Sequence, residues 1–237
     1  MSGFDGMDDL ARLEREQLRL ATSSPPPWSP GPGSLVIGGV FVAFARGEQG
    51  PGRAGDRAVV GAAATKGTEP IASVVVDGHA MAPYRPGLLA AREGALLEAA
   101  VLALREDGIE LDVLLVDATG RDHPRRAGLA LHLGEVVQLP TVGVTHRPLL
   151  ASGPEPADEV GSWTELVFDG EVLGRWVRTQ AGVRPLAVHG AWRTDPRTAM
   201  DVVLQATATA RTPEPLRLAR TAAREARSQR AVADRAG

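Results

Sequence analysis

Residues 111–134 carry the sharpest change from apolar to polar positions in the chain. The run Val-Leu-Leu-Val at 113–116 is continuously apolar between charged neighbours, which is typical of a strand buried on both faces. Asp117 ends this run, and open α/β sheets bind ligands at the carboxyl edge of such strands. Gly120 then permits a sharp turn before a basic stretch. The pattern fits either a metal-binding Asp beside phosphate-binding side chains or a capped connection with a solvated basic loop.

Three segments with strand character come earlier, at residues 35–45, 58–65 and 71–76. Their short connections predict an antiparallel meander. A helix is expected after residues 83–87, because apolar residues from Leu89 onward recur at helical spacing. This order of a meander, a helix and a buried strand resembles the ribonuclease H-like fold. We therefore expect an α/β protein with a mixed central sheet flanked by helices.

Glu93 lies on or beside the apolar face of this predicted helix, four residues after Leu89 and four before Leu97. A carboxylate in that position is costly unless it is paired or bound to a metal ion. Alternatively, Glu93 lies at the edge of the apolar face and reaches solvent with its carboxylate. The spacing alone supports both interpretations.

The remaining segments suggest a main domain with an extension at each end. Residues 7–21 are consistent with a short amphipathic helix, and a proline-rich connector follows it. A hairpin around Asp169-Gly170, a strand at 184–188 and a helix at 198–210 are predicted downstream. The expected divisions are an N-terminal helix and connector (1–34), a main domain (35–219) and an Arg/Ala-rich tail (220–237).

Composition excludes several classes of protein. The 237 residues include no cysteine, which excludes disulfides and thiolate metal sites and fits a reducing compartment. No apolar run approaches transmembrane length, and the first residues lack a secretory-signal pattern. We therefore expect a cytoplasmic protein without a membrane partner. The formal net charge of −3 gives no overall attraction for nucleic acid, so any such contact has to be local.

Several segments together resemble the endonuclease V family. In order they are PYRPGLLAAREG, LLVDATGRDHPRRAGLALHLG, LPTVGV, VLGRWVRTQAGVRPLAV and PEPLRLA, and the similarity spans residues 35–219. The most specific element is Asp-x-x-Gly-x-x-His-Pro-Arg at residues 117–125. The resemblance implies a ribonuclease H-like fold. It also implies an enzyme that, with Mg²⁺ or Mn²⁺, cuts a nucleic-acid strand on the 3′ side of a deaminated base such as inosine.

The resemblance also assigns roles to individual residues. Glu93 and Asp117 match catalytic, metal-binding carboxylates, and His123 matches the catalytic histidine of the His-Pro-Arg element. The proline-flanked segment before the helix, Pro83, Tyr84, Arg85 and Pro86, matches the family's wedge, which enters the nucleic-acid strand beside the lesion. The structural alternative for this segment is a rigid helix-entry turn. The other nucleic-acid contacts that the resemblance implies are at Gly87, Leu88, Gly120, Arg125 and His146.

The chain departs from the family pattern at positions that matter for chemistry. Phe41 stands where the family has a metal-binding Asp, and Trp192 stands at an active-site His. The structural alternative is that Phe41 extends the core of its strand and that Trp192 is a core or base-stacking residue. His189 and Asp77 are candidates to replace lost ligands, and His146 replaces a usual lysine. Hydrolysis needs cations to neutralise the phosphate and activate water. We therefore expect bound metal to be weak or absent and the family's cleavage to be weakened or lost.

Three functions remain open at this stage. The first is an endonuclease V-type hydrolase with altered metal chemistry. The second is a noncatalytic family member that binds deaminated or branched nucleic acid, and the third is a scaffold for a protein partner. The retained Glu93, Asp117 and His123 favour the first two. For these we expect a monomer whose partner is DNA or RNA containing deaminated bases.

Overall fold

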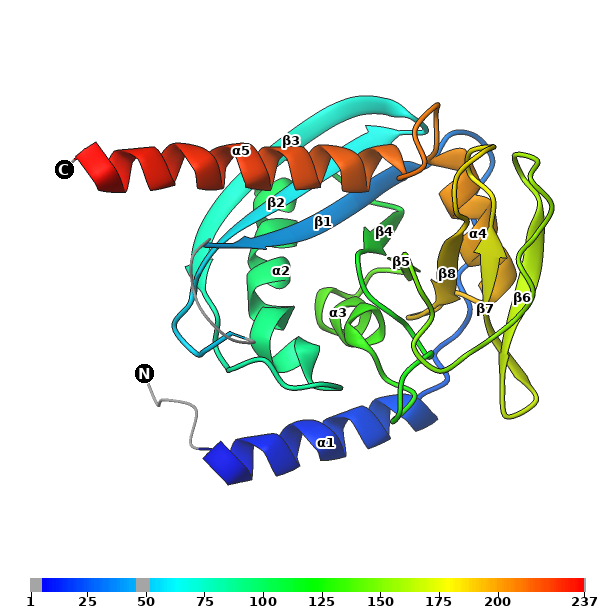
Figure 1. Cartoon of the computed structure of the whole chain (residues 1–237), viewed down its shortest axis with the longest axis horizontal. Helices are drawn as coiled ribbons and strands as arrows, with labels where there is room; N and C mark the ends of the chain where they lie inside the picture. Colours follow the sequence, from blue (N-terminus) through cyan, green and yellow to red (C-terminus); the bar gives the residue numbers. More distant parts are fainter. Residues whose placement is uncertain (1–5, 46–51, 237) are drawn as a thin grey trace.

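A mixed β-sheet with helices on both faces forms the body of the protein (Figure 1). The structure is a computed structural model that describes residues 6–45 and 52–236. Within these residues the sheet has eight strands in the order β3-β2-β1-β4-β5-β8-β7-β6. They are β1 (Val36–Phe44), β2 (Arg57–Lys66), β3 (Glu69–His79), β4 (Val113–Val116), β5 (Thr141–Thr145), β6 (Trp163–Phe168), β7 (Glu171–Val177) and β8 (Leu186–Gly190). The mixed α/β class predicted from the sequence is confirmed.

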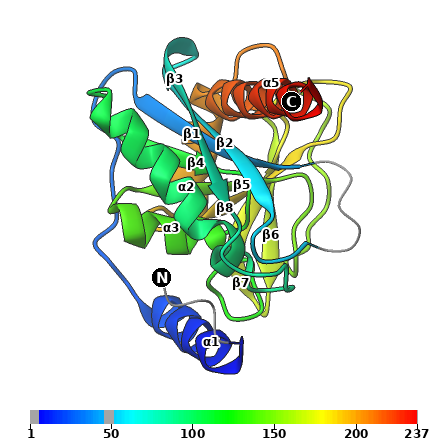
Figure 2. The same cartoon turned by 90° about the vertical axis from the view of Figure 1, so that its left-hand side faces the viewer.

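Helices from different parts of the chain cover the two faces of the sheet. They are α1 (Gly6–Thr22), α2 (Leu89–Glu106), α3 (Leu129–Val137), α4 (Pro196–Gln205) and α5 (Glu214–Ala236). Figure 2 shows α2 and α3 on one face and α5 on the other. Accordingly, Leu97 and Leu133 belong to one buried core, whereas Val202 and Leu216 belong to the second core on the opposite face.

The first strands of the sheet bring the candidate site together. β1, β2 and β3 form the expected antiparallel meander, and β4 pairs with β1 in parallel. Val40 lies opposite Val116 in that pairing. Because both strands run in the same direction, the next residues, Phe41 and Asp117, lie side by side where β4 ends. Further along, β6 and β7 form the predicted hairpin. Asp169 and Gly170 at its turn both have positive φ, as a type I′ turn requires.

The C-terminal helix α5 lies directly on β1 and β2. A Cβ atom at Gly39 would lie 2.4 Å from the carbonyl carbon of Pro215, and one at Gly61 would lie 2.1 Å from the carbonyl oxygen of Ala219. These two glycines therefore let the helix backbone approach the sheet closely. The expected domain boundary between residues 219 and 220 falls inside this continuous helix. Arg220 consequently belongs to an element that is packed on the sheet.

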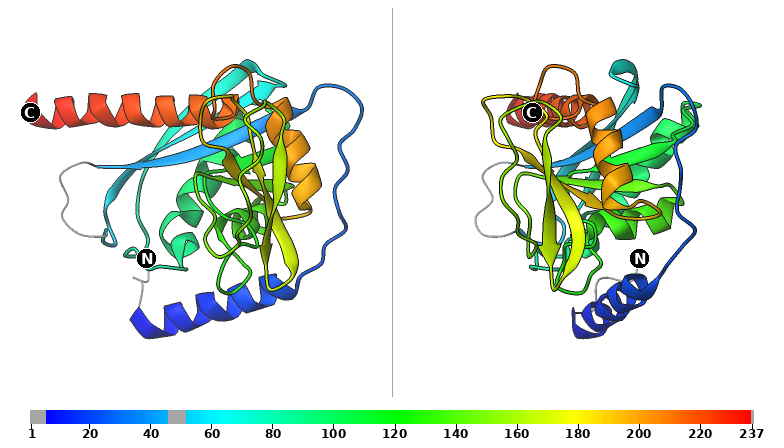
Figure 3. Two further views of the ribbon diagram at one scale, coloured as in Figure 1. Left: turned by 45° about the vertical axis from the view of Figure 1, so that its right-hand side comes forward. Right: turned by 90° about the vertical axis from the view of Figure 1, so that its right-hand side faces the viewer.

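The N-terminal helix α1 lies apart from the sheet and close to the start of α2 (Figure 3). The side-chain amide of Gln17, which is buried, donates to the carbonyls of Gly87 and Ala127 at 2.9 and 3.1 Å. The proline-rich connector then runs along the outside of the protein to β1. It is fixed where the backbone N–H of Trp28 donates to the Arg193 carbonyl. No helix among the described residues combines the length and apolar character of a membrane span.

Candidate nucleic-acid and metal site

An open cavity of about 230 Å³ lies where β1, β4 and α2 meet. Its ionisable lining residues are Glu93, from the second turn of α2, and Asp117, which directly follows β4. Phe41 of β1 lines the same cavity, together with apolar residues that include Leu97 and Leu129. The structure therefore brings Glu93, Asp117 and Phe41 to one place, although they come from three separate elements.

Glu93 is half-buried, and its carboxyl has an unusual affinity for protons. Burial raises the pKa of Glu93 to about 7, while the Arg92 guanidinium opposes the rise and the Asp117 carboxylate adds to it. The contribution of Asp117 means that the two carboxylates are close enough to repel each other. Two carboxylates that repel across a cavity are a typical place for a cation. The identity of that cation is the central question of the site.

The cation that contacts Asp117 is a side chain of the protein itself. Arg220 of α5 donates from Nη2 to Oδ2 of Asp117 at 2.8 Å. The guanidinium carbon of Arg220 also lies 5.1 Å from the centre of the Phe41 ring, and that of Arg224 lies 5.4 Å from it. Both distances suit a cation–π contact. Phe41 and Asp117 thus hold the Arg220 guanidinium from two sides.

This donor set does not fit a magnesium or manganese site. Mg²⁺ requires near-octahedral coordination by oxygen, and Mn²⁺ also favours carboxylate, carbonyl and water oxygens. Phe41 offers no donor atom, and one oxygen of Asp117 already accepts from Arg220. Within residues 6–45 and 52–236, no group of three His, Cys, Asp or Glu side chains could hold a metal ion. The structure therefore disagrees with the divalent-metal centre that the family resemblance implies.

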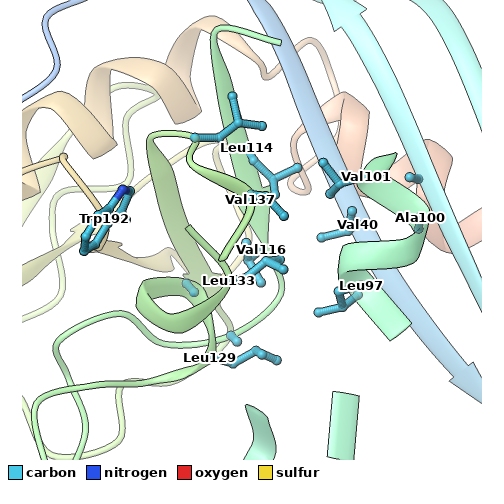
Figure 4. Close-up of a cluster of buried hydrophobic side chains, with 14 of the residues drawn as sticks. Val40, Leu97, Ala100, Val101, Leu114, Val116, Leu129, Leu133, Val137 and Trp192 are labelled. Atoms are coloured by element: carbon cyan, nitrogen blue, oxygen red, sulfur yellow. The ribbon is translucent and has the colours of Figure 1, made fainter. Parts of the chain in front are cut away.

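Trp192 does not line this cavity, which favours the core interpretation of this residue over an active-site position. The Trp192 ring is buried in the core with Leu133 and Val137 of α3. In the view of Figure 4, these α3 side chains lie between Trp192 and Leu97. The backbone N–H of Trp192 donates to the hydroxyl of Thr141 at 3.1 Å, which anchors the loop after β8. Its side chain is part of the core.

The suggested replacement ligands also lie elsewhere. His189 of β8 is fully buried, and its Nε2 lies 3.0 Å from the Thr145 hydroxyl. Burial lowers the pKa of His189 to about 4, although Asp122 acts in the opposite direction. Asp77 of β3 forms an ion pair with Arg230 at 2.5 Å. Neither residue lines the cavity.

His123 and Arg125 converge on the carbonyl of Gly87, at the entry to α2. The backbone N–H of Arg125 donates to Nδ1 of His123 at 3.1 Å, so Nε2 carries the proton and donates to the Gly87 carbonyl at 3.1 Å. Nη2 of Arg125 donates to the same carbonyl at 3.0 Å, and its Nε donates to Gln17 at 2.6 Å. Burial lowers the pKa of His123, and the neighbouring Arg125 lowers it further. In this arrangement, both side chains fix the segment that precedes α2.

The proline-flanked segment itself is open to solvent. The Tyr84 side chain is 42% exposed, Arg85 and Pro86 are exposed, and Pro83 is half-buried. Leu88, the N-cap residue of α2, is buried. The backbone N–H of Tyr84 donates to the carbonyl of Gly52 at 3.1 Å. An exposed aromatic ring on a fixed backbone is suited to stacking on a base.

The last two predicted contact residues, Gly120 and His146, do not line the cavity. Gly120 packs against the backbone of Gly190, since a Cβ atom at Gly120 would lie 2.2 Å from the Gly190 carbonyl oxygen. His146 is exposed and lines a second hollow with Trp176 and Arg184. Burial lowers the pKa of His146, and the charges of Arg211, Asp117 and Arg220 also act on it. His146 therefore lies within electrostatic reach of the Asp117–Arg220 pair.

Arg220 is the site residue that sequence reasoning missed. It directly follows the segment PEPLRLA, yet the Arg/Ala-rich composition from that point suggested a tail. A usable signal was the apolar residue at position 41. Where Phe41 removes an expected carboxylate, a new cation is the natural partner for the remaining Asp117.

Comparison with known proteins places the chain in a family. The family model described as Endonuclease V matches residues 23–221. A curated relative, the endonuclease V of Methanopyrus kandleri, is 44% identical over 145 residues, which is 61% of each chain. The matched part therefore spans about three fifths of that relative's length.

Solved structures show the same fold. The endonuclease V of Streptomyces avermitilis has a TM-score of 0.80 and 32% identity, covering 97% of this chain and 96% of that chain. The endonuclease V of Ciona intestinalis was solved in complex with a 24mer DNA containing an inosine followed by a ribo-adenosine. It has a TM-score of 0.79 and 21% identity, covering 94% of this chain and 98% of that chain. The ribonuclease H-like architecture expected from the sequence is confirmed. Since the family model covers all but the two ends, the chain belongs to the endonuclease V family.

Proposed function

We propose that this protein binds DNA or RNA strands containing a deaminated base such as inosine, and that its metal-dependent phosphodiester hydrolysis is weak or lost. The observation that carries the proposal is the Asp117–Arg220 ion pair beside Phe41. In this pair a guanidinium contacts the carboxylate that a catalytic metal ion would need. Mg²⁺ or Mn²⁺ would find Glu93 and one free oxygen of Asp117, which predicts weak binding of either ion.

The binding half of the proposal is supported by the exposed segment of residues 83–86. Tyr84 is open to solvent, and the backbone just after it is fixed by donors from Gln17, His123 and Arg125. A preorganised aromatic side chain loses little entropy when a base stacks on it. Extrusion of a base costs least where its pairing is already weak, which favours deaminated or single-stranded sites.

The test measures binding and cleavage on the same oligonucleotides. Single-stranded DNA and RNA with one inosine, and matched strands with adenine at that position, are incubated with Mg²⁺, Mn²⁺ or EDTA. We expect fluorescence anisotropy to show tighter binding of the inosine strands, and denaturing gels to show little or no cleavage.

Variants make the outcome interpretable. Strong cleavage that Asp117→Ala abolishes and Glu106→Gln leaves intact would contradict the loss of hydrolysis, because Glu106 is an exposed carboxylate of the same protein on α2. Equal, weak binding to all strands would contradict nucleic-acid recognition and leave the protein-scaffold hypothesis.

A further inference from the structure

Arg220 is held firmly but still has hydrogen-bond donors to spare. A guanidinium carries five N–H groups, and Nη2 of Arg220 uses one of them on Asp117. Its Nε is buried and has no hydrogen-bond partner among the described residues. The side chains of Arg220 and Asp117 remain 22% and 29% exposed, so an incoming group can reach the pair. A buried donor without a partner is costly, which marks this as a place where an acceptor is missing.

The surroundings of Arg220 favour an anionic acceptor. Arg224, one turn further along α5, presents a second guanidinium to the same Phe41 ring, and Arg224 is exposed. Two guanidiniums thus lie beside the Phe41 ring, and one of them pairs with the Asp117 carboxylate. Because burial raises the pKa of Glu93, the other carboxyl of the cavity, to about 7, positive charge predominates at this edge of the cavity at neutral pH. The close packing of α5 on Gly39 and Gly61 fixes the height of both side chains above the sheet.

We propose that Arg220 binds a backbone phosphate of the nucleic-acid strand at this cavity, in place of a divalent cation. The planar fork of a guanidinium matches the oxygens of a phosphodiester and stays charged at every physiological pH. Asp117 takes one N–H and leaves others for the phosphate. The inference rests on the proposed function, because it names the contact through which this cavity engages the strand.

The test compares binding of an inosine-containing single strand in EDTA and in Mg²⁺ at equal ionic strength, over a salt titration. The variants are Arg220→Ala, Arg220→Lys, Asp117→Asn and, as a control for charge, Arg197→Ala, an exposed arginine on α4. Thermal unfolding of each variant confirms that it is folded. Wild-type affinity should be the same in EDTA and in Mg²⁺.

Each variant has a distinct expected result. Arg220→Ala should weaken binding roughly tenfold or more, and lower the slope of log K against log salt by about 0.7. Arg220→Lys should fall between it and wild type, and Arg197→Ala should match wild type. Asp117→Asn keeps an acceptor for Arg220 and removes a negative charge, so it should bind in EDTA at least as tightly as wild type.

Three outcomes would overturn the inference, and they separate it from the proposed function. If wild type binds in EDTA and Arg220→Ala binds equally well with the same salt slope, Arg220 makes no phosphate contact and the proposed function stands. If wild type binds only with Mg²⁺, a metal ion makes the phosphate contact instead. If wild type binds no strand under either condition, the proposed function fails and the inference fails with it.

Discussion

Replacing Glu93 with Gln should change how the stability of the protein depends on pH. Glu93→Gln keeps the shape of the side chain and removes its titration. Burial raises the pKa of Glu93 from its ordinary value of 4.5 to about 7. Below pH 4.5 the carboxyl is protonated in both the folded and unfolded states, so its ionisation does not affect stability. Between these two pKa values, only the unfolded state ionises, and unfolding releases a proton.

The sign and size of the effect follow from this difference. Stability falls with rising pH wherever the unfolded state binds fewer protons than the folded state. Each pH unit in this window is worth about 1.4 kcal/mol. Wild type should therefore lose about 3 kcal/mol relative to Glu93→Gln between pH 4.5 and pH 7, with no further change at higher pH.

The assay is urea unfolding followed by tryptophan fluorescence for both proteins, in steps from acid to mildly alkaline pH. Other titrating groups act on both proteins, so the difference between their unfolding free energies isolates Glu93. Glu106→Gln, on the exposed side of α2, serves as the control and should track wild type. A constant difference across the pH range, or a wild type that gains on Glu93→Gln as pH rises, would refute the reasoning.

Three other changes test separate parts of the structure. Tyr84→Ala should weaken binding of inosine-containing strands by about 1–3 kcal/mol through lost stacking, measured by anisotropy. The control Trp163→Ala removes a ring of β6 that is 43% exposed, against 42% for Tyr84, and should not change binding. Gly61→Ala should lower the free energy of unfolding in urea by about 1–3 kcal/mol, because its Cβ collides with α5. A Cβ atom at Gly31 meets no atom within 4 Å, so Gly31→Ala should be neutral. Equal stabilities of the two variants would show that α5 does not pack tightly on β2. Asp56→Ala removes the carboxylate 2.6 Å from the buried Arg92 guanidinium and should lower the free energy of unfolding by about 3–5 kcal/mol. Asp77→Ala breaks an exposed ion pair with Arg230 and should cost less than about 1 kcal/mol in the same assay. A small loss from Asp56→Ala would mean that the buried pair is compensated elsewhere.

The parts of the site that depend on local pattern could be predicted from the sequence. The apolar run before Asp117 and the four-residue spacing around Glu93 are properties of one strand and one helix. The apolar run indicates a strand buried on both faces, and the spacing around Glu93 indicates which side of the helix is buried. Parallel pairing of β1 with β4 then brings Phe41 beside Asp117. For these residues the order of elements, together with the resemblance to the endonuclease V family, was enough.

The parts that depend on distant packing could not be predicted in this way. Arg220 reaches Asp117 only because Gly39 and Gly61 let α5 lie close to the sheet, and nothing within α5 specifies that contact. Trp192 shows that a position in a motif does not fix the direction of the side chain. Its position in a motif suggested the active site, but Thr141 holds the loop after β8 so that the ring turns into the core. Sequence spacing defines distance along the chain, whereas side-chain direction is set by the tertiary contacts of each loop.

The Gly87 carbonyl ties three distant parts of the chain into one junction. Donors from Gln17 in α1 and from His123 and Arg125 converge on it, directly beside the exposed residues 84–86. A nucleic-acid strand that displaces these residues on binding has to stretch or break hydrogen bonds that hold α1. That helix is therefore mechanically coupled to the occupancy of a surface it does not form, and the amide-exchange rate of α1 becomes a remote readout of strand engagement.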